Sequence, residues 1–357
     1  MKKVFAVLLA LVMVLGALVA CSGKKEEAKT ADTEGELVVY GSCEEDYLAA
    51  ACKKFEELYG IKTTYQRMST GEVPAKIAEE KGKPSADVWF GGTNNPYDQA
   101  AADGLLDNSY VPENAKHLLK DMYKDPNGYW YGIYTGLLGF MVNTDELKRL
   151  GLEAPQTWDD LLKPEYKGLI WLSNYNTAGT PKLVANLMIQ LKGKEAGIQY
   201  LVDLDKNVQI YTKSGSGPSK NVGTGECVIG IGFLHDGITQ IVDNGYENVQ
   251  LIVPADGTAC EIGPVALFKG AAHPKAAQKF MEFALSPECV ELAAQNGSYQ
   301  FLVIDNAKQP EAAAKFGLDP SLVWDGYDFG KAVTDTKQNV EDVMKALNGG
   351  DDRFKTE

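Results

Sequence analysis

The fold is decided by residues 36–66, which read ELVVYGSCEEDYLAAACKKFEELYGIKTTYQ. The first six residues are mostly apolar and end in a glycine, which predicts a short strand over 36–41. Apolar side chains at helical spacing follow over 45–59, and they share one face. Residues 60–66 predict a second strand. The stretch therefore predicts a strand, a helix and a strand in succession.

The alternation continues beyond this stretch. Helix-period residues run from about 72 to 81, and ADVWF at 86–90 predicts a third strand that ends in two glycines. Strands that alternate with amphipathic helices indicate βαβ units, mostly parallel sheets and an α/β fold. Ligands of such sheets lie beyond the carboxyl ends of the strands. The candidate site segments are therefore 42–43, 92–94, 173–180, 212–219, 233–236 and 258–261.

The N-terminus has the pattern of an export signal. Lys2 and Lys3 precede an apolar run over 4–20, which is shorter than the roughly 20 residues of a membrane-spanning helix. The run ends in LVAC at 18–21, which resembles the lipobox of bacterial lipoproteins. That resemblance implies that Cys21 is acylated and becomes the new N-terminus. An ordinary secretory signal and an uncleaved anchor are the alternatives.

A polar segment follows the cysteine. Residues 22–36 contain no apolar side chain larger than alanine, so they cannot bury enough surface to fold. We therefore assign 1–20 to a signal peptide and 21–35 to a lipidated flexible tether. The mature protein is expected in the periplasm or at the outer cell surface, lipid-anchored to a membrane.

Length and charge narrow the class of protein further. About 320 residues follow the tether, more than one hydrophobic core usually serves, so two lobes are expected. The formal net charge is −14, and removal of Lys2 and Lys3 takes it to −16. We expect no nucleic-acid partner, because such a partner needs a basic stripe. The acidity mainly favours solubility.

The cysteines and histidines give no metal-site pattern. Five of the six cysteines remain once Cys21 carries lipid, so at least one thiol stays unpaired within a monomer. The others either form disulfides in an oxidising compartment or stay reduced and buried. No cysteine pair has the spacing of a zinc site, and the chain has only three histidines. We expect neither a metal nor a cofactor.

The middle of the chain carries a family resemblance. Its segments are DPNGYWYGIY at 125–134, GFMVN at 139–143, PQTWDDLLKPEYKGLI at 155–170 and TAGT at 177–180. Together they resemble the solute-binding lipoproteins of ABC importers, in the branch that includes ferric-ion, phosphonate and sugar-phosphate receptors. The resemblance runs from about residue 36 to residue 297 and covers most of the mature chain.

The resemblance implies a two-lobed periplasmic-binding-protein type II fold whose strand crossovers form the hinge. It also implies closure over one small solute and delivery to a membrane permease and its ATPase, and we expect a monomer. Two apolar, glycine-flanked stretches, 136–143 and 263–269, suit strands that pass between lobes. We place lobe one at 36–137 plus 263–320, lobe two at 138–262, and a C-terminal helix and tail at 321–357.

The chain departs from the ferric-ion receptors of this branch. Those receptors hold the metal with a tyrosine pair, and this chain has His235 and Asp236 at that place. Their acidic ligand after the third strand is here Gly92, and the imidazole expected near the first strand is replaced by Cys43 and Glu44. Three of the metal ligands that the resemblance implies are therefore absent.

A sugar phosphate fits the same positions better. FLHDG at 233–237 and GTACEIG at 257–263 resemble hexose-phosphate receptors. Carboxylates accept hydrogen bonds from vicinal hydroxyls, and a neutral imidazole can donate or accept one more. We therefore predict that Asp236, Glu261 and His235 bind hydroxyl groups. The alternative for each carboxylate is an ordinary surface turn or lobe edge, and an iron site would need both of them together with other tyrosines.

A phosphate group needs several neutral donors near helix N-termini, where the helix dipole favours an anion. Segments 173–180, 214–219 and 93–96 each adjoin a predicted helix start. Simple helix capping is the alternative for each, since Ser, Thr and Asn are the usual caps. We expect phosphate contacts from Ser173, Thr177, Ser214 and Ser216, and contacts that close the site from Ser42 and Thr93.

These residues predict a solute-binding lipoprotein for a small phosphorylated solute, with a sugar phosphate favoured. An aminoalkylphosphonate receptor is the runner-up, and a ferric-ion-binding protein with a non-standard site is a further alternative. Catalysis is not expected, because adjacent His235 and Asp236 cannot orient each other as triad partners do and no Gly-x-Ser-x-Gly elbow is present. A lipoprotein that only senses its ligand would have the same pocket.

Overall fold

The computed structural model describes residues 35–349 and 351–355. Strand β1 (Glu36–Gly41) and helix α2 (Glu45–Tyr59) have the bounds that the sequence predicts. Strands β2 (Lys62–Arg67) and β3 (Val88–Phe90) lie within two residues of their predicted bounds. The predicted signal peptide and the acylated Cys21 lie outside the described residues, as does the tether up to residue 34.

The remaining elements continue the α/β pattern. The other strands are β4 (Leu106–Asp107), β5 (Tyr131–Asn143), β6 (Ile170–Ser173), β7 (Val208–Thr212), β8 (Ile229–Phe233), β9 (Val249–Ile252), β10 (Cys260–Phe268) and β11 (Phe301–Leu302). The other α-helices are α3 (Val73–Glu79), α4 (Asn94–Ala102), α5 (Thr144–Leu150), α6 (Thr180–Lys192), α7 (Lys194–Asp205), α8 (Gly217–Val222), α9 (Leu234–Val242), α10 (Pro274–Ala284), α11 (Pro287–Val290), α12 (Leu292–Gln295), α13 (Glu311–Lys315) and α14 (Phe329–Ala346). Six short 3-10 helices complete the described chain, from η1 (Glu113–His117) to η6 (Asp352–Phe354).

The strands join in the order β2-β1-β3-β10-β5-β8-β6-β7. β1 pairs in parallel with β2 and β3, and β6 pairs in parallel with β7 and β8. The long strands β5 and β10 pair antiparallel with all of their neighbours. The expectation of mostly parallel sheets is therefore wrong, because strands that cross between the two parallel groups run against the strands they pass.

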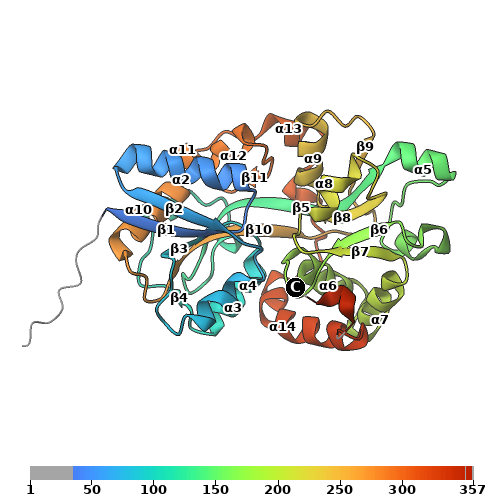
Figure 1. The fold of residues 1–357 in the computed structure, drawn as a ribbon, viewed down its shortest axis with the longest axis horizontal. Coiled ribbons are helices and arrows are strands. Elements are labelled where there is room, and N and C mark those ends of the chain that lie inside the picture. The colour runs from blue at the N-terminus through green and yellow to red at the C-terminus, as the bar shows by residue number, and fades with distance from the viewer. Residues whose placement is uncertain (1–34, 350, 356–357) are drawn as a thin grey trace, which may run out of the picture. The chain divides into compact units, whose positions relative to one another are not determined.

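Strand β5 connects the two parallel groups (Figure 1). Its residues 131–137 pair with β10, and its residues 138–142 pair with β8. All thirteen of its residues are buried. The predicted crossover over 136–143 lies within β5, and most of the second predicted crossover lies within β10. This pairing supports the lobe boundaries, which stay a prediction.

Helices cover both faces of the strands (Figure 1). The C-terminal helix α14 packs against α6 and α7 and also contacts α4. Its Thr336 hydroxyl accepts hydrogen bonds from Asn95 of α4 at 3.1 Å and from Asn186 of α6 at 2.5 Å. All three side chains are buried. The Thr336 hydroxyl therefore links α14 to α4 and α6 through hydrogen bonds that are shielded from water.

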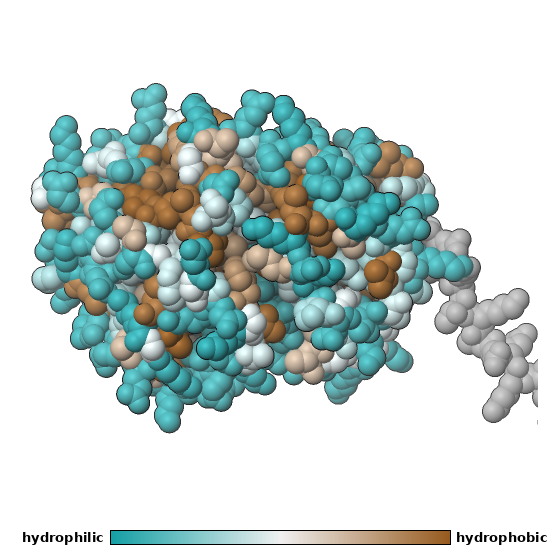
Figure 2. Space-filling view, turned by 180° about the vertical axis from the view of Figure 1, so that it is seen from behind, coloured by the Kyte–Doolittle hydropathy of each residue, from teal (hydrophilic) through white to brown (hydrophobic). Residues whose placement is uncertain are grey.

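The surface and the thiols of the described residues complete the description of the fold. Hydrophilic residues make up most of the face shown in Figure 2, with hydrophobic residues visible between them. Within the described part of the chain, no helix combines the length and the apolar character that a membrane crossing requires. All five described cysteines are buried and free, which matches the reduced alternative and not the disulfide one.

The TWDDL motif at 157–161 places the buried ring of Trp158 in the core. Trp158 packs edge-on against Phe140 of β5, with ring centroids 4.8 Å apart, and its indole N–H donates to the Gly257 carbonyl at 2.9 Å. The Asp160 carboxylate accepts from the Thr157 amide at 3.0 Å, and the Thr157 hydroxyl accepts from the Asp160 amide at 3.1 Å. These reciprocal bonds fix the turn that delivers the ring to the core.

Trp158→Ala is expected to lower the free energy of unfolding by about 3–5 kcal/mol, because it leaves a large cavity and an unpaired Gly257 carbonyl. Chemical denaturation of the purified protein measures this loss. Val111→Ala is the control, since that side chain is 69% exposed and its loss should stay within about 0.5 kcal/mol. Equal, small effects for both variants would contradict the role given to the ring.

Candidate functional site

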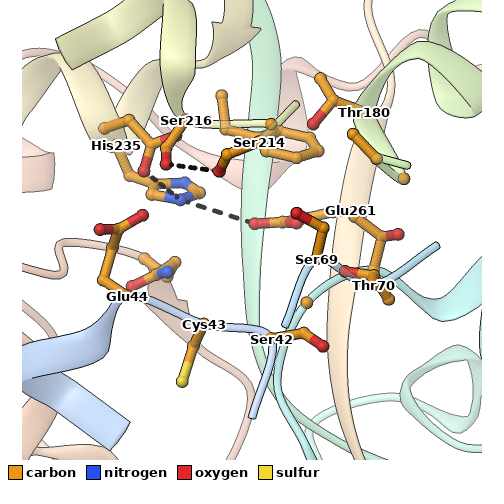
Figure 3. Close-up of a pocket in the computed structure, with 18 of the residues that line it drawn as sticks. Ser42, Cys43, Glu44, Ser69, Thr70, Thr180, Ser214, Ser216, His235 and Glu261 are labelled. Atoms are coloured by element: carbon orange, nitrogen blue, oxygen red, sulfur yellow. Dashed lines mark hydrogen bonds and ion pairs between the residues drawn. The ribbon is translucent and has the colours of Figure 1, made fainter. Parts of the chain in front are cut away.

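The candidate site is a cavity at the ends of several strands (Figure 3). Residues 42–44 follow β1, 92–93 follow β3, and 214–216 follow β7. The cavity holds about 470 Å³ of empty space, part of which is open to solvent. This position agrees with the rule that ligands of α/β sheets lie beyond the carboxyl ends of strands.

Most of the predicted site residues meet in this cavity. Seven of the nine line it: Ser42, Thr93, Ser214, Ser216, His235, Asp236 and Glu261. Ser173 and Thr177 do not line it. Thr177 turns away because its hydroxyl donates to the Lys213 carbonyl at 2.6 Å, and Ser173 is the fully buried last residue of β6. The predicted phosphate contacts from these two residues therefore lack access to the cavity.

Helix capping does not occupy the cavity's hydroxyl groups. Thr93 and Ser216 stand at the N-cap positions of α4 and α8, and neither makes a side-chain capping bond. The Thr93 hydroxyl is buried and has no hydrogen-bond partner among the described residues. The capping alternative is thereby removed at both positions, and Thr93 presents an unsatisfied donor to the cavity.

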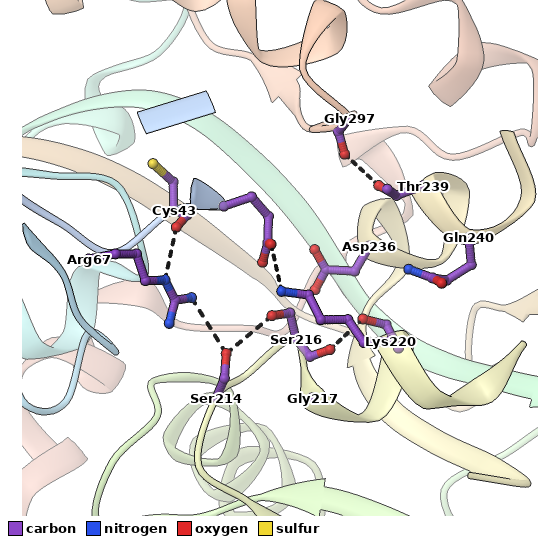
Figure 4. A network of polar contacts seen from close by, with 12 residues as sticks. Cys43, Arg67, Ser214, Ser216, Gly217, Lys220, Asp236, Thr239, Gln240 and Gly297 are labelled. Atoms are coloured by element: carbon purple, nitrogen blue, oxygen red, sulfur yellow. Dashed lines mark hydrogen bonds and ion pairs between the residues drawn. The ribbon is translucent and has the colours of Figure 1, made fainter. Parts of the chain in front are cut away.

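The sequence analysis missed other residues of the lining. They are Glu44, Arg67, Ser69, Thr70, Tyr134 and Gln300. Arg67 is the last residue of β2, and its guanidinium donates to the Cys43 carbonyl at 3.3 Å and to Ser214 Oγ at 3.5 Å (Figure 4). The strand-end rule could have found Arg67, because the predicted second strand stopped at residue 66. Gln300 follows no predicted element, and no sequence pattern marks it.

An imidazole lies beside two buried carboxyl groups in the wall of the cavity. His235 Nε2 is 3.3 Å from Asp236 Oδ1 and 3.5 Å from Glu261 Oε1 (Figure 3). Burial lowers the pKa of His235 to about 3, so the ring is neutral near pH 7. Burial, reinforced by the charge of Glu44, raises the pKa of Asp236 to about 8. Burial beside Asp236 also raises the pKa of Glu261.

Gly136 of β5 makes room for this imidazole. A Cβ atom at position 136 would lie 2.2 Å from His235 Nδ1 and 3.2 Å from Glu261 Oε1. The first contact is closer than a real Cβ atom allows and the second is unusually tight, so a side chain at position 136 would displace the ring from the strand. The sequence motif that marks the crossover strand therefore also positions the site.

Contacts across the cavity join its two sides. The Gly71 amide donates to the Thr177 carbonyl at 3.1 Å, and a Cβ at position 71 would lie 2.7 Å from that carbonyl oxygen. An ion pair between Glu44 and Lys220 at 2.8 Å adds a second contact (Figure 4). Although burial opposes it, this ammonium and the Ser216 hydroxyl hold the pKa of Glu44 below its usual value.

Comparison with known proteins defines the class. The family of bacterial extracellular solute-binding proteins matches residues 83–331, and the chain belongs to this family. A relative from Haemophilus influenzae with no assigned function is 39% identical over 311 residues, which cover 85% of this chain and 87% of the relative. The protein is thus a solute-binding protein of the extracellular and periplasmic type.

Solved structures show which proteins have a fold similar to that of this chain. AfuA of Actinobacillus pleuropneumoniae, solved with fructose-6-phosphate bound, gives a TM-score of 0.82 at 35% identity and covers 88% of this chain and 99% of its own. The periplasmic binding protein P5PA gives 0.81 at 32% identity, with the same coverage of 88% and 99%. A ferric binding protein of Campylobacter jejuni, at 20% identity and a TM-score of 0.71, shares the fold alone. These likenesses confirm the periplasmic-binding-protein type II fold.

Gly71→Ala is expected to weaken ligand binding about 10- to 100-fold, because the added methyl group meets backbone atoms that cannot move aside. Calorimetric titration measures the loss, and small-angle scattering should show a larger radius of gyration for the variant at saturating ligand. Gly35→Ala is the control, since a Cβ there meets nothing within 4 Å. Unchanged affinity in Gly71→Ala would show that the two sides do not need this contact.

Asp236 is expected to contribute stability to the ligand-free protein that is lost as pH rises from about 4 to about 8, because it is buried as the neutral acid and its folded pKa exceeds the unfolded value. Asp236→Asn should remove this contribution, so the stability of the variant gains on wild type by at most about 1.4 kcal/mol per pH unit across that range. Denaturant unfolding at several pH values tests it. Parallel stability curves for the two proteins would refute the buried neutral acid.

Proposed function

We propose that the protein is a lipid-anchored receptor of an ABC import system that captures a small sugar phosphate and delivers it to a membrane permease. The observation that carries this proposal is the composition of the cavity: its wall combines an acid–imidazole cluster with several hydroxyl groups and one guanidinium. A phosphorylated polyol carries groups that match both sets.

The acid–imidazole cluster suits vicinal hydroxyls. Asp236 and Glu261 can each accept hydrogen bonds from a polyol, and the neutral His235 ring adds a further polar group beside them. Exchange of water for ligand hydroxyls keeps these buried groups paired, whereas a ligand without hydroxyls would leave them unsatisfied. The cluster therefore discriminates through the cost of unpaired groups.

The guanidinium and the hydroxyl groups of the cavity suit a phosphate. Arg67 supplies a fixed positive charge, while Ser214 and Ser216 supply hydroxyl groups that lie 3.1 Å from each other. The Trp89 indole donates to Ser42 Oγ at 3.0 Å, which leaves the Ser42 hydroxyl hydrogen free for the ligand. Thr93 adds its unpartnered hydroxyl. In this proposal, these groups bind the phosphate in place of Ser173 and Thr177.

Relatives support the same ligand class. AfuA was solved with fructose-6-phosphate bound, and almost the whole AfuA chain aligns with this protein. A Salmonella typhimurium relative, whose name proposes 2-aminoethylphosphonate as its ligand, is 29% identical over 244 residues, 66% of this chain and 67% of the relative. An aminoalkylphosphonate stays the second candidate, because its ammonium group could donate to the carboxyl oxygens of Asp236 or Glu261, which line the cavity.

Iron is disfavoured by the site's geometry. No group of three or more His, Cys, Asp and Glu that could hold a metal ion occurs in the described part of the chain. Gly92, at the place of a metal ligand in ferric-ion receptors, has φ +93°, and a Cβ there would lie 2.3 Å from the Thr70 hydroxyl. The cavity has no room for a carboxylate at that position. We expect binding without catalysis, as in other solute-binding proteins.

Calorimetric titration with glucose 6-phosphate, inorganic phosphate, 2-aminoethylphosphonate and ferric citrate tests the proposal. Glucose 6-phosphate should bind most tightly. Asp236→Ala should weaken glucose 6-phosphate at least about tenfold and inorganic phosphate much less, since only the sugar brings vicinal hydroxyls to the acid–imidazole cluster. Heat from ferric citrate alone, or equal losses for both phosphates, would overturn the assignment. Release of the protein from membranes by Cys21→Ala tests the lipid anchor.

A further inference from the structure

A buried amide lines the same cavity and has no assigned role. The Gln300 side chain is 3% exposed, and its Oε1 atom has no hydrogen-bond partner among the described residues. A buried polar group without a partner is rare in folded proteins, because its desolvation is not repaid. Such a group in the wall of a ligand cavity points to a partner that arrives with the ligand.

The segment that carries Gln300 is held on two sides. Thr239 of α9 donates to the Gly297 carbonyl at 2.6 Å (Figure 4), and the Tyr299 hydroxyl donates to Asp243 Oδ1 at 2.6 Å. On the other side, Phe301 pairs with Thr135 of β5. These anchors fix the backbone before and after the amide. The fold therefore sets the position of the Gln300 amide in the wall of the cavity.

The amide stands at the level of the acid–imidazole cluster. Strands β10 and β11 pair with opposite edges of β5, where Glu261 pairs with Gly136 and Phe301 pairs with Thr135. Gln300, one residue before Phe301, therefore enters the cavity beside Gly136 from the edge opposite Glu261. His235 packs on Gly136 between these two edges. Three different polar side chains thus surround one small volume.

We infer that Gln300 is a specificity-determining residue whose amide hydrogen-bonds a hydroxyl group of the solute on the side opposite Glu261. This inference rests on the proposed function and adds that the solute brings a hydrogen-bond donor to this side of the cavity. A hydroxyl can donate to the unpartnered amide oxygen. An unprotonated phosphate oxygen only accepts, so it cannot pair with that atom.

A hydroxyl suits this position whichever way the amide is turned. The oxygen and nitrogen of a glutamine can exchange places with little change in shape. A hydroxyl both donates and accepts, so it can pair with whichever of the two atoms faces the solute, whereas an ammonium can pair only with the oxygen.

Gln300→Met keeps the length of the side chain and removes the amide group that could form hydrogen bonds with the solute. The variant is expected to bind glucose 6-phosphate about tenfold more weakly in calorimetric titration, with inorganic phosphate affinity changed less than about threefold. Gln300→Glu should lower the ratio of glucose 6-phosphate to 2-aminoethylphosphonate affinity about tenfold or more, because a carboxylate favours the ammonium. Gln199→Met, at an exposed glutamine, is the control and should change neither ligand.

Equal losses of glucose 6-phosphate and inorganic phosphate in Gln300→Met, or no loss of either, would overturn the inference. Thermal unfolding of the ligand-free variant gives an independent decision, since removal of an unpaired amide should leave the melting temperature unchanged or raise it. A melting temperature lower by several degrees would show a structural role instead. If wild type binds no sugar phosphate, the proposed function fails, and the thermal measurement still decides whether the Gln300 amide awaits a partner.

Discussion

The packing of the His235 ring on a glycine of strand β5 is the constraint on which the site depends. β5 pairs with β10 and β11 along its first half and with β8 and β9 along its second, so it cannot shift without breaking both groups of strands. The absence of a side chain at Gly136 lets the imidazole lie directly on this rigid strand. Rigid support of this kind holds a binding constellation in place before the ligand arrives.

The same constraint carries an energetic cost in the ligand-free protein. Asp236 and Glu261 are 9% and 4% exposed, and burial raises the pKa of both carboxyl groups. Unpartnered atoms of Thr93, His235 and Gln300 add to the cost. A ligand that forms hydrogen bonds with these groups gains affinity, so the same groups lower stability in the ligand-free protein and favour binding. The protein is therefore less stable when the cavity is empty than when it is filled.

The sequence predicted the fold where local pattern decides it and failed where distant contacts do. The first strand and helix have their predicted bounds because apolar spacing alone defines them. The antiparallel pairing of β5 and β10 depends on strands far apart in sequence, which no local pattern encodes. Seven predicted residues line the cavity because strand ends converge there, whereas Thr177 turns toward Lys213 and Gln300 enters from a segment without a pattern.

The most direct test of the account is a crystal structure of the protein with glucose 6-phosphate. The account predicts that sugar hydroxyls lie within hydrogen-bonding distance of Asp236 and Glu261, and that the phosphate lies among Arg67, Ser214 and Ser216. A phosphate placed against the two carboxyl groups, or a sugar bound outside this cavity, would contradict it.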